Sequence, residues 1–222
     1  MQAYWAGEST AQLTIESILG TTQVPVDIYF RTMEDMPQAE LYALSLARGP
    51  VLDVGAGSGC HSLVLQDMDI EVVALEWSEG MAQIMRERGV QQVVHGDFWA
   101  HPPTRYQTLL CMMNGIGFVA HPDRLPDFFA QCDQLLAPGG QVLLDSTDLR
   151  SNVSEIEKRN LHPDYFGILT YRMAFDEEWS PPFDWLYADP ELLEQAAMAA
   201  GWRMHLIFQA EDGHFLARLV RN

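Results

Sequence analysis

Three glycines alternate with small residues at Gly55, Gly57 and Gly59, directly after the apolar run 51–54. A side chain at such positions would block the approach of the backbone to a ligand, and tight turns often need the positive φ that glycine adopts easily. The run that follows, 60–66, is compatible with a helix. A strand, a glycine turn and a helix in this order open a doubly wound α/β domain, in which a ligand lies over the carboxyl ends of parallel strands. The turn therefore predicts a ligand site.

Two acidic residues frame this glycine turn. Asp53 lies two residues before Gly55, and Glu76 ends the next apolar run, 72–75. The pattern G-x-G-x-G also differs from the G-x-G-x-x-G that is typical of dinucleotide-binding turns. With these carboxylates in place, the segment resembles the class I S-adenosylmethionine-dependent methyltransferases.

The resemblance extends beyond the turn. It covers residues 50–148 closely and 189–221 in outline, and a frequent signature of the family precedes the fifth expected strand as Leu136-Ala137-Pro138-Gly139-Gly140. It implies an enzyme that binds S-adenosylmethionine and releases S-adenosylhomocysteine. It also implies a doubly wound, Rossmann-like α/β fold with a seven-stranded mixed sheet whose final strand is antiparallel.

The same resemblance implies roles for residues at the strand ends. The glycine turn would hold the amino-acid tail of the cofactor, since the positive end of the next helix favours its carboxylate, and Asp53 would accept from its amino group. Glu76 would accept from both ribose hydroxyls. Asp97 would accept from the adenine amino group or form an ordinary Asx turn, and Trp77 would lie against the adenine or pack in the core. The predicted cofactor-binding residues are Asp53, Gly55, Ala56, Gly57, Gly59, Glu76, Trp77, Asp97, Phe98, Met113 and Asn114.

Methyl transfer itself asks little of catalytic side chains. An in-line displacement at the methyl carbon needs the nucleophile and the sulfonium at attack distance, and such positioning supplies about 7–11 kcal/mol. A general base is needed only if the acceptor is protonated at the working pH. The Asn-Pro-Pro-Tyr type of motif of amino-group methyltransferases is replaced by Asn114-Gly115-Ile116-Gly117, in which the glycines leave room for a ligand or simply permit a turn. The sequence therefore identifies no catalytic residue.

Candidates for the acceptor site come from three segments. In the N-terminal loop, Tyr29 and Arg31 could close over the cofactor, with Arg31 pairing its carboxylate, or could be surface residues. Asp145 and Asp148 follow the fifth strand and could orient a substrate amine, act as a base or cap a loop. Aromatic residues beyond them could line an apolar pocket or form a small core: Tyr171, Trp179, Trp185 and Tyr187. The acceptor-binding residues that we predict are Tyr29, Arg31, Asp145, Tyr171 and Trp185.

Apolar periodicity predicts the elements that position these residues. Residues 9–19 are predicted to form a helix with Gly20 as its stop, and a second helix begins near Pro37 and ends at Gly49. Strands and helices then alternate, and the chain ends in a β-hairpin. The strands are expected at 51–54, 71–75, 91–95, 107–113, 141–145, 202–209 and 214–220, and the helices at 78–88, 123–136 and 189–200.

We expect a single domain over residues 1–222. Residues 1–48 would form an N-terminal helical cap. Residues 149–188 are not needed by the minimal fold and would form an inserted β unit, with strands near 169–175 and 183–187. In the family that the sequence resembles, insertions after the fifth strand usually cover the substrate site. Specificity is therefore expected in the cap and the insert.

The composition narrows the choice of partners. Thirty-one acidic against thirteen basic residues give a formal charge of −18. This charge disfavours nucleic acids and anionic membranes, because phosphates are bound largely through Lys and Arg. No apolar run approaches a membrane span and no signal peptide is evident, so a cytoplasmic location is expected. The apolar surroundings of Cys60, Cys111 and Cys132 predict buried, reduced thiols, and no histidine spacing suggests a metal site.

These observations favour methyl transfer to an oxygen or nitrogen atom of a small-molecule acceptor. A protein methyltransferase acting on a basic segment is the alternative, because an acidic surface would suit it. A nicotinamide-dependent oxidoreductase is disfavoured by the glycine spacing and by the lack of a second nucleotide-binding half. A cofactor-binding module without catalysis stays open, since cofactor binding and catalysis are separable. The oligomeric state is left open.

Overall fold

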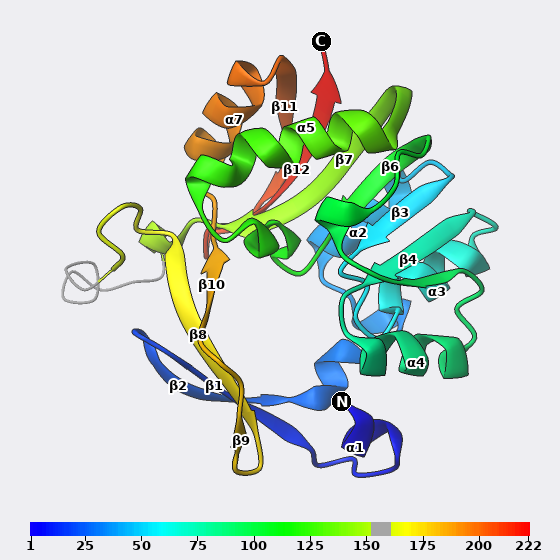
Figure 1. The fold of residues 1–222 in the computed structure, drawn as a ribbon, viewed down its shortest axis with the longest axis vertical. Helices are drawn as coiled ribbons and strands as arrows, with labels where there is room; N and C mark the ends of the chain where they lie inside the picture. Colours follow the sequence, from blue (N-terminus) through cyan, green and yellow to red (C-terminus); the bar gives the residue numbers. More distant parts are fainter. Residues whose placement is uncertain (152–160) are drawn as a thin grey trace.

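The larger sheet of the computed structural model forms the platform of the molecule (Figure 1). The structure describes residues 1–151 and 161–222, and seven of the described strands pair in the order β11-β12-β7-β6-β3-β4-β5. Each pair of neighbouring strands among β7, β6, β3, β4 and β5 is parallel. Strand β12 is antiparallel to both β7 and β11. The predicted doubly wound α/β fold with a seven-stranded mixed sheet is confirmed. The bounds are β3 (Val51–Val54), β4 (Val72–Glu76), β5 (Val93–His95), β6 (Tyr106–Cys111), β7 (Leu136–Thr147), β11 (Trp202–Gln209) and β12 (His214–Arg221).

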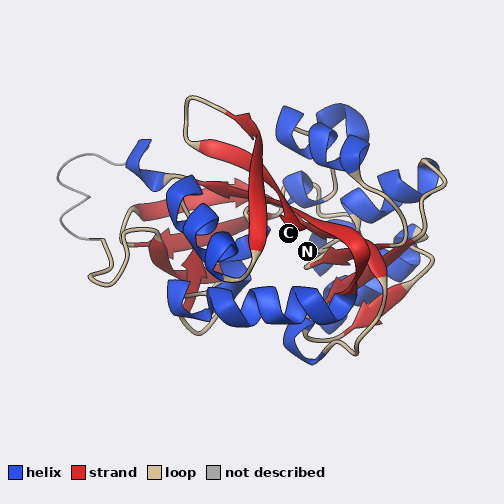
Figure 2. Cartoon of the chain, turned by 90° about the horizontal axis from the view of Figure 1, so that it is seen from above, coloured by secondary structure: helices blue, strands red, loops and turns tan. Residues whose placement is uncertain are grey.

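Helices cover both faces of this sheet (Figure 2). Buried residues of α2 and α3 share one apolar cluster, and those of α5 and α7 share another. The helix α4 begins and ends as predicted, because the Ser78 hydroxyl accepts from a backbone N–H of the first turn and Gly89 has a left-handed φ of 95°. Among the described residues, no helix is long and apolar enough to cross a membrane. The bounds are α1 (Gln2–Trp5), α2 (Gln38–Leu46), α3 (Cys60–Asp67), α4 (Glu79–Arg88), α5 (Leu125–Leu135) and α7 (Pro190–Ala199).

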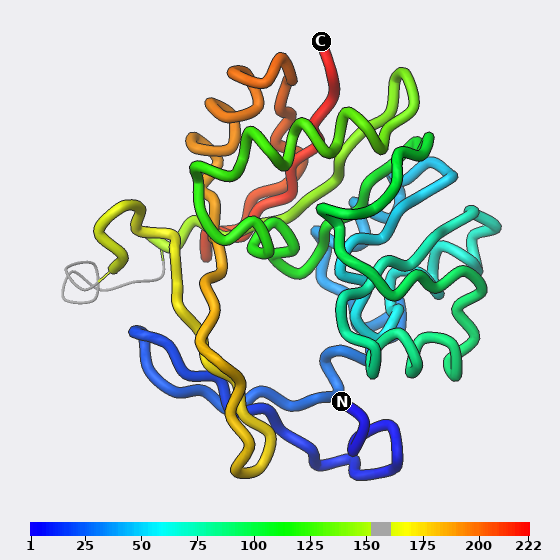
Figure 3. Tube along the Cα trace, viewed as in Figure 1, coloured from blue at the N-terminus to red at the C-terminus, as the bar shows by residue number. Residues whose placement is uncertain are grey.

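A smaller sheet joins the N-terminal segment to the insert. Strand β1 pairs with β2 and β8, and β8 pairs in turn with β9 and β10, all antiparallel. Figure 3 shows these blue N-terminal strands beside the yellow and orange insert, far apart as they are in the sequence. Both strands predicted in the insert are present, as β8 and β10, while residues 152–160 of the predicted unit lie outside the described residues. The bounds are β1 (Gln12–Ser17), β2 (Gly20–Pro25), β8 (Ile168–Phe175), β9 (Glu178–Trp179) and β10 (Phe183–Leu186).

The helix predicted over residues 9–19 is wrong. Residues Gln12–Ser17 form β1, and Gly20, with a φ of 121°, begins the second strand of a hairpin instead of ending a helix. Leu13 and Ile15 occupy alternate positions of the strand and border the same cavity, as the two-residue period of a strand requires. The apolar spacing also fits a helix, but the segment pairs with both the adjacent β2 and the distant β8, and these pairings form a strand. The predicted N-terminal cap is therefore helical only in part.

Candidate active site

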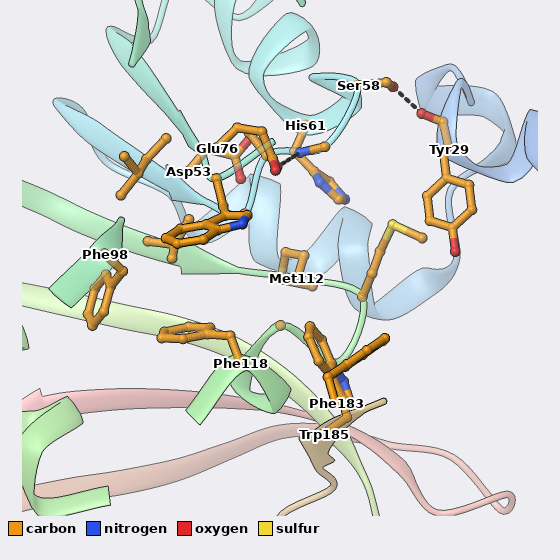
Figure 4. Close-up of a pocket in the computed structure, with 18 of the residues that line it drawn as sticks. Tyr29, Asp53, Ser58, His61, Glu76, Phe98, Met112, Phe118, Phe183 and Trp185 are labelled. Carbon is orange, nitrogen blue, oxygen red and sulfur yellow. Dashed lines mark hydrogen bonds between the residues drawn. The ribbon is translucent and has the colours of Figure 1, made fainter. Parts of the chain in front are cut away.

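A cavity of about 890 Å³ lies where the carboxyl ends of the parallel strands meet the smaller sheet. Its lining combines the ends of β3, β4 and β6 with residues of β1, β8 and β10. Figure 4 shows a polar group beside the glycine turn opposite an aromatic group, with Asp53, His61 and Glu76 across from Phe118, Phe183 and Trp185. The predicted residues that line the cavity are Asp53, Gly55, Ala56, Gly57, Glu76, Trp77, Asp97, Phe98, Met113, Tyr29, Tyr171 and Trp185.

Four predicted site residues lie outside this lining: Gly59, Asn114, Arg31 and Asp145. Gly59 precedes α3 with a φ of 85°, and a Cβ atom there would lie only 2.7 Å from Val90. It therefore serves the close packing of the turn against a neighbouring segment. The direct ligand contacts expected of these four residues stay predictions.

Glu76 holds the glycine turn in place. Its two carboxylate oxygens accept hydrogen bonds from the backbone N–H of Gly57 and of Ser78, each at 2.8 Å. Burial raises the pKa of this carboxyl above its ordinary value, and the two N–H donors offset only part of that effect. Each oxygen of a carboxylate offers two lone pairs, so Glu76 can accept from a ligand while it keeps both backbone bonds.

The segments after β4 and β5 supply an exposed indole and a carboxylate, respectively. One Asp97 oxygen accepts from Trp99 N–H at 3.0 Å, so the Asx turn that the sequence left as an alternative is present. Asp97 nevertheless lines the cavity, and the two roles coexist because a carboxylate has further lone pairs. Trp77 is 74% exposed at the rim of the cavity, which excludes the alternative of core packing. Phe98 is buried beside them.

A strained corner ends β6 beside the cavity. Met113 and Asn114 both have left-handed backbones, with φ of 62° and 56°. Such conformations cost about 1–3 kcal/mol each and persist only where the surroundings impose them. Here the buried Asp145 carboxylate accepts from Asn114 N–H at 2.8 Å and contacts His214 Nε2 at 2.7 Å, while Thr147 donates to the Asn114 side chain at 2.8 Å. Asp145 thus fixes the shape of the corner.

Three charged side chains form a hydrogen-bonded chain that no sequence pattern predicted and that ends at the cavity. Arg31 donates to both oxygens of Glu40, at 2.8 and 3.0 Å, and Glu40 contacts His61 Nε2 at 2.8 Å. His61 lines the cavity although only 5% of it is exposed. The position of His61 in the first helical turn after the glycine loop could have indicated a site residue. Its partner Glu40 could not be predicted, because Glu40 lies on α2, far away in the sequence. Since Arg31 is engaged by Glu40, its predicted pairing with the cofactor is without support.

The charge state of His61 follows from its neighbours. Burial lowers the pKa of the imidazole, but the hydrogen bond with Glu40 and the nearby carboxylates of Asp53, Glu40 and Asp145 more than offset it, so that the pKa lies above its ordinary value. Asp53 is itself fully buried, and its pKa is raised by that burial despite a 2.6 Å hydrogen bond from Ser62. The imidazole of His61 therefore keeps its proton to a higher pH than an ordinary histidine does.

The smaller sheet supplies an aromatic wall, which consists of Tyr171 on β8, Phe183 and Trp185 on β10, and Tyr187 directly after β10. Tyr171 and Tyr187 line the cavity with their hydroxyl oxygens 2.8 Å apart, next to Trp185 and Tyr29. Burial raises the pKa of all three phenols, so they stay protonated. Trp179 is exposed and lies outside the lining.

Gly117 packs directly against the indole of Trp185. A Cβ atom at residue 117 would overlap three atoms of that ring. The sequence left open whether this glycine makes room for a ligand or permits a turn, and the structure shows that the room is taken by the indole. Gly115 does line the cavity.

The cysteines are free, buried thiols, as predicted. Burial raises the pKa of Cys111 and Cys132 well above the ordinary range of a thiol, which disfavours the nucleophilic thiolate. Within residues 1–151 and 161–222, no three His, Cys, Asp or Glu side chains are grouped to hold a metal ion. The expectation of a metal-free site stays a prediction.

Comparison with known proteins identifies the family. A family model described as a methyltransferase domain matches residues 51–140. The solved structure of an S-adenosylmethionine-dependent methyltransferase from Bacteroides fragilis, in complex with S-adenosyl-L-homocysteine, is 33% identical, with a TM-score of 0.90, and the match covers 99% of this chain and 92% of that one. The chain belongs to the S-adenosylmethionine-dependent methyltransferases. The predicted class I fold, enzyme class and cofactor are thereby confirmed.

More distant structures share the fold of this methyltransferase. The CcbJ methyltransferase from Streptomyces caelestis is 20% identical, with a TM-score of 0.67 over 88% of this chain and 96% of that one. The glycopeptide N-methyltransferase MtfA in complex with S-adenosylmethionine is 19% identical, with a TM-score of 0.59 over 83% of this chain and 93% of that one. No curated protein matches the sequence.

Proposed function

We propose that this methyltransferase transfers the methyl group of S-adenosylmethionine to an oxygen or nitrogen atom of a small-molecule acceptor. The observation that carries the proposal is the position of the smaller sheet, which brings β1, β8 and β10 over the carboxyl ends of the parallel strands. The resulting cavity of about 890 Å³ is within the range of small-molecule sites. In the transfer, a bond forms between the acceptor atom and the methyl carbon as the bond from carbon to the sulfonium breaks.

The polar half of the cavity suits the cofactor. Under this proposal Glu76 accepts from the ribose hydroxyls, Asp97 accepts from the adenine amino group and Trp77 lies against the adenine face; that all three line the cavity supports these roles. We assign to Asp53 the hydrogen bond from the amino group of the tail. We assign the tail carboxylate to His61, which lines the cavity from the first turn of α3, together with the positive end of that helix.

Cofactor binding is expected to weaken as the pH rises through the pKa of His61. Because this pKa is raised, the imidazole is cationic below it and loses its charge above it, and the attraction for the tail carboxylate is lost in the same interval. Calorimetric titration with S-adenosylhomocysteine from about pH 6 to pH 9 measures the effect.

Two controls isolate the contribution of His61. The amino group of S-adenosylhomocysteine also loses its proton as the pH rises, so the profile of His61→Asn shows the part that belongs to the ligand alone. Methylthioadenosine, which lacks the tail, should bind equally at all pH values. A His61→Asn variant with the same pH profile as the wild type would remove His61 from the site.

A protein acceptor and a non-catalytic module are the competing functions. A basic protein segment would suit the charge of −18, but it would have to enter beneath the aromatic wall formed by β8 and β10. A sensor would bind the cofactor without turnover.

Incubation with methyl-labelled S-adenosylmethionine separates the three functions. Parallel reactions receive either a pool of small metabolites or purified basic proteins. We expect label in the small molecules. Label in the proteins alone would establish the protein methyltransferase, and tight cofactor binding with no label in either pool would favour the sensor.

A further inference from the structure

In the half of the cavity beneath the smaller sheet, which we call the acceptor half, Asp184 is the charged side chain among the described lining residues. Asp53, Glu76 and Asp97 belong to the cofactor half, and among the described lining residues only His61 has a basic side chain, in that same half. The remaining basic group is the α-amino group of Met1, whose pKa is lowered by burial. An anionic acceptor would therefore meet no basic side chain among the described residues of this half.

Asp184 borders this half but does not alter that conclusion. In the β8–β10 pair, Asp184 lies opposite Thr170, whereas Phe183 and Trp185 lie opposite Tyr171 and Leu169. Successive residues of a strand point to opposite faces, and the Asp184 carboxylate accepts from Thr170 Oγ1 at 2.5 Å on the face away from the aromatic wall. The hydrogen bond from Thr170 and the contact with a histidine lower its pKa, so its charge stays on the outer face.

The polar groups of the acceptor half are phenols. The hydroxyl oxygens of Tyr171 and Tyr187 are 2.8 Å apart, and Tyr29 lines the same cavity. When one phenol donates to the other, lone pairs remain that accept from a ligand. Because burial raises their pKa, these oxygens accept hydrogen bonds but do not take the proton of an alcohol.

We propose that the acceptor is a neutral amine on an apolar, aromatic-sized body, held by the Tyr171–Tyr187 hydroxyl pair against the aromatic wall. The inference rests on the function proposed above and narrows its acceptor. An amine needs no base in the transition state, since its nitrogen lone pair attacks the methyl carbon while its N–H groups donate to the phenols. The electrons of the carbon–sulfur bond return to sulfur, and the positive charge moves from sulfur to nitrogen.

The aromatic wall suits the charge that this step creates. The ring faces of Phe183 and Trp185 attract a cation within about 6 Å, so the new ammonium is stabilised where it forms. It then releases its proton to water. An alcohol would instead need a base at this point, and the acceptor half offers none among its described side chains.

A matched set of acceptors tests the proposal. The probes are 2-phenylethylamine, 2-phenylethanol and 3-phenylpropionate, together with the same three groups on a naphthyl and an indolyl body. Formation of S-adenosylhomocysteine is followed with each probe. We expect methylation of the amines and none of the carboxylates, with a rate that rises with pH as the amine loses its proton.

The outcomes separate this inference from the proposed function. Preferred methylation of the alcohols or carboxylates overturns the amine acceptor. Binding of S-adenosylhomocysteine without methylation of any amine overturns it as well, and a reaction with other small molecules would then leave the proposed function standing. Failure to bind the cofactor would refute the proposed function itself.

Variants of the phenol pair test its positioning role. In Tyr187→Phe and in Tyr171→Phe, kcat/KM for the best amine should fall about tenfold, because a hydrogen bond worth about 1.4 kcal/mol is lost. Affinity for S-adenosylhomocysteine should not change. The pH profile should keep its shape, whereas a changed profile would make the tyrosine a base and contradict the proposal. Tyr42→Phe, an exposed residue outside the cavity, is the matched control and should leave both quantities unchanged.

Discussion

Replacing Glu76 by alanine is expected to weaken the binding of S-adenosylhomocysteine about 10- to 100-fold. A hydrogen bond to a charged group contributes about 1.5–3 kcal/mol, and each 1.4 kcal/mol changes a dissociation constant tenfold. The carboxylate also holds the backbone N–H of Gly57 and Ser78, so its removal loosens the glycine turn as well. Calorimetric titration of both proteins measures the ratio of their dissociation constants.

An analogue of S-adenosylhomocysteine without the 2′-hydroxyl separates the two roles of Glu76. The wild type should bind this analogue more weakly than the parent ligand, and Glu76→Ala should bind the two equally, because the hydroxyl has then lost its acceptor. A variant that still distinguishes the two ligands would assign the ribose to another residue. A loss of affinity below twofold would reject the whole assignment.

The residues of the cofactor half could be predicted from the sequence because their interactions are local. The glycine turn, Asp53 and Glu76 lie within one strand–turn–helix–strand unit, and the positive φ of Gly55 and Gly57 is the property that their residue type indicates. The caps of α4 are equally local, since Ser78 and Gly89 act on the turns next to them. When a residue interacts with its neighbours in the sequence, its type and position are enough to predict the local structure.

The acceptor half depends on contacts that no local pattern shows. Strand β1 joins the wall of the cavity through its pairing with β8 of the insert, although the apolar spacing of residues 9–19 suits a helix equally well. His61 gains its significance from Glu40 on α2, and Gly117 from Trp185 on β10. In each case a residue from a distant segment decides the structure.

The strained corner links the two halves. Met113 and Asn114 lie where the fourth parallel strand ends, both with a left-handed backbone, and Asn114 is held by Asp145 and Thr147 of β7. This arrangement fixes the start of η4 (Gly115–Val119), the segment that follows the corner and packs against β10. The strained corner therefore sets how the aromatic wall lies relative to the cofactor half.

Gly117→Ala is expected to lower kcat/KM for the acceptor about 100-fold while the affinity for S-adenosylhomocysteine stays within twofold of the wild type. The new methyl group would overlap the indole of Trp185 and push β10 away from η4. A displacement of about 1 Å in a positioned reactant can cost about 100-fold in rate. Residues of the glycine turn are not touched, so cofactor binding is preserved. Steady-state kinetics with the best acceptor and calorimetry with S-adenosylhomocysteine measure the two quantities.

A double-mutant cycle shows whether the clash is the cause. Trp185→Ala removes the ring that the new methyl group would meet, so adding Gly117→Ala to that variant should change the remaining activity less than twofold. Non-additivity of this kind is the signature of residues in direct contact. Thermal unfolding of all four proteins checks that each is folded. Full additivity, with the same 100-fold loss in both backgrounds, would mean that Gly117 acts through its backbone. The packing of the Trp185 indole against Gly117 would then not position the acceptor.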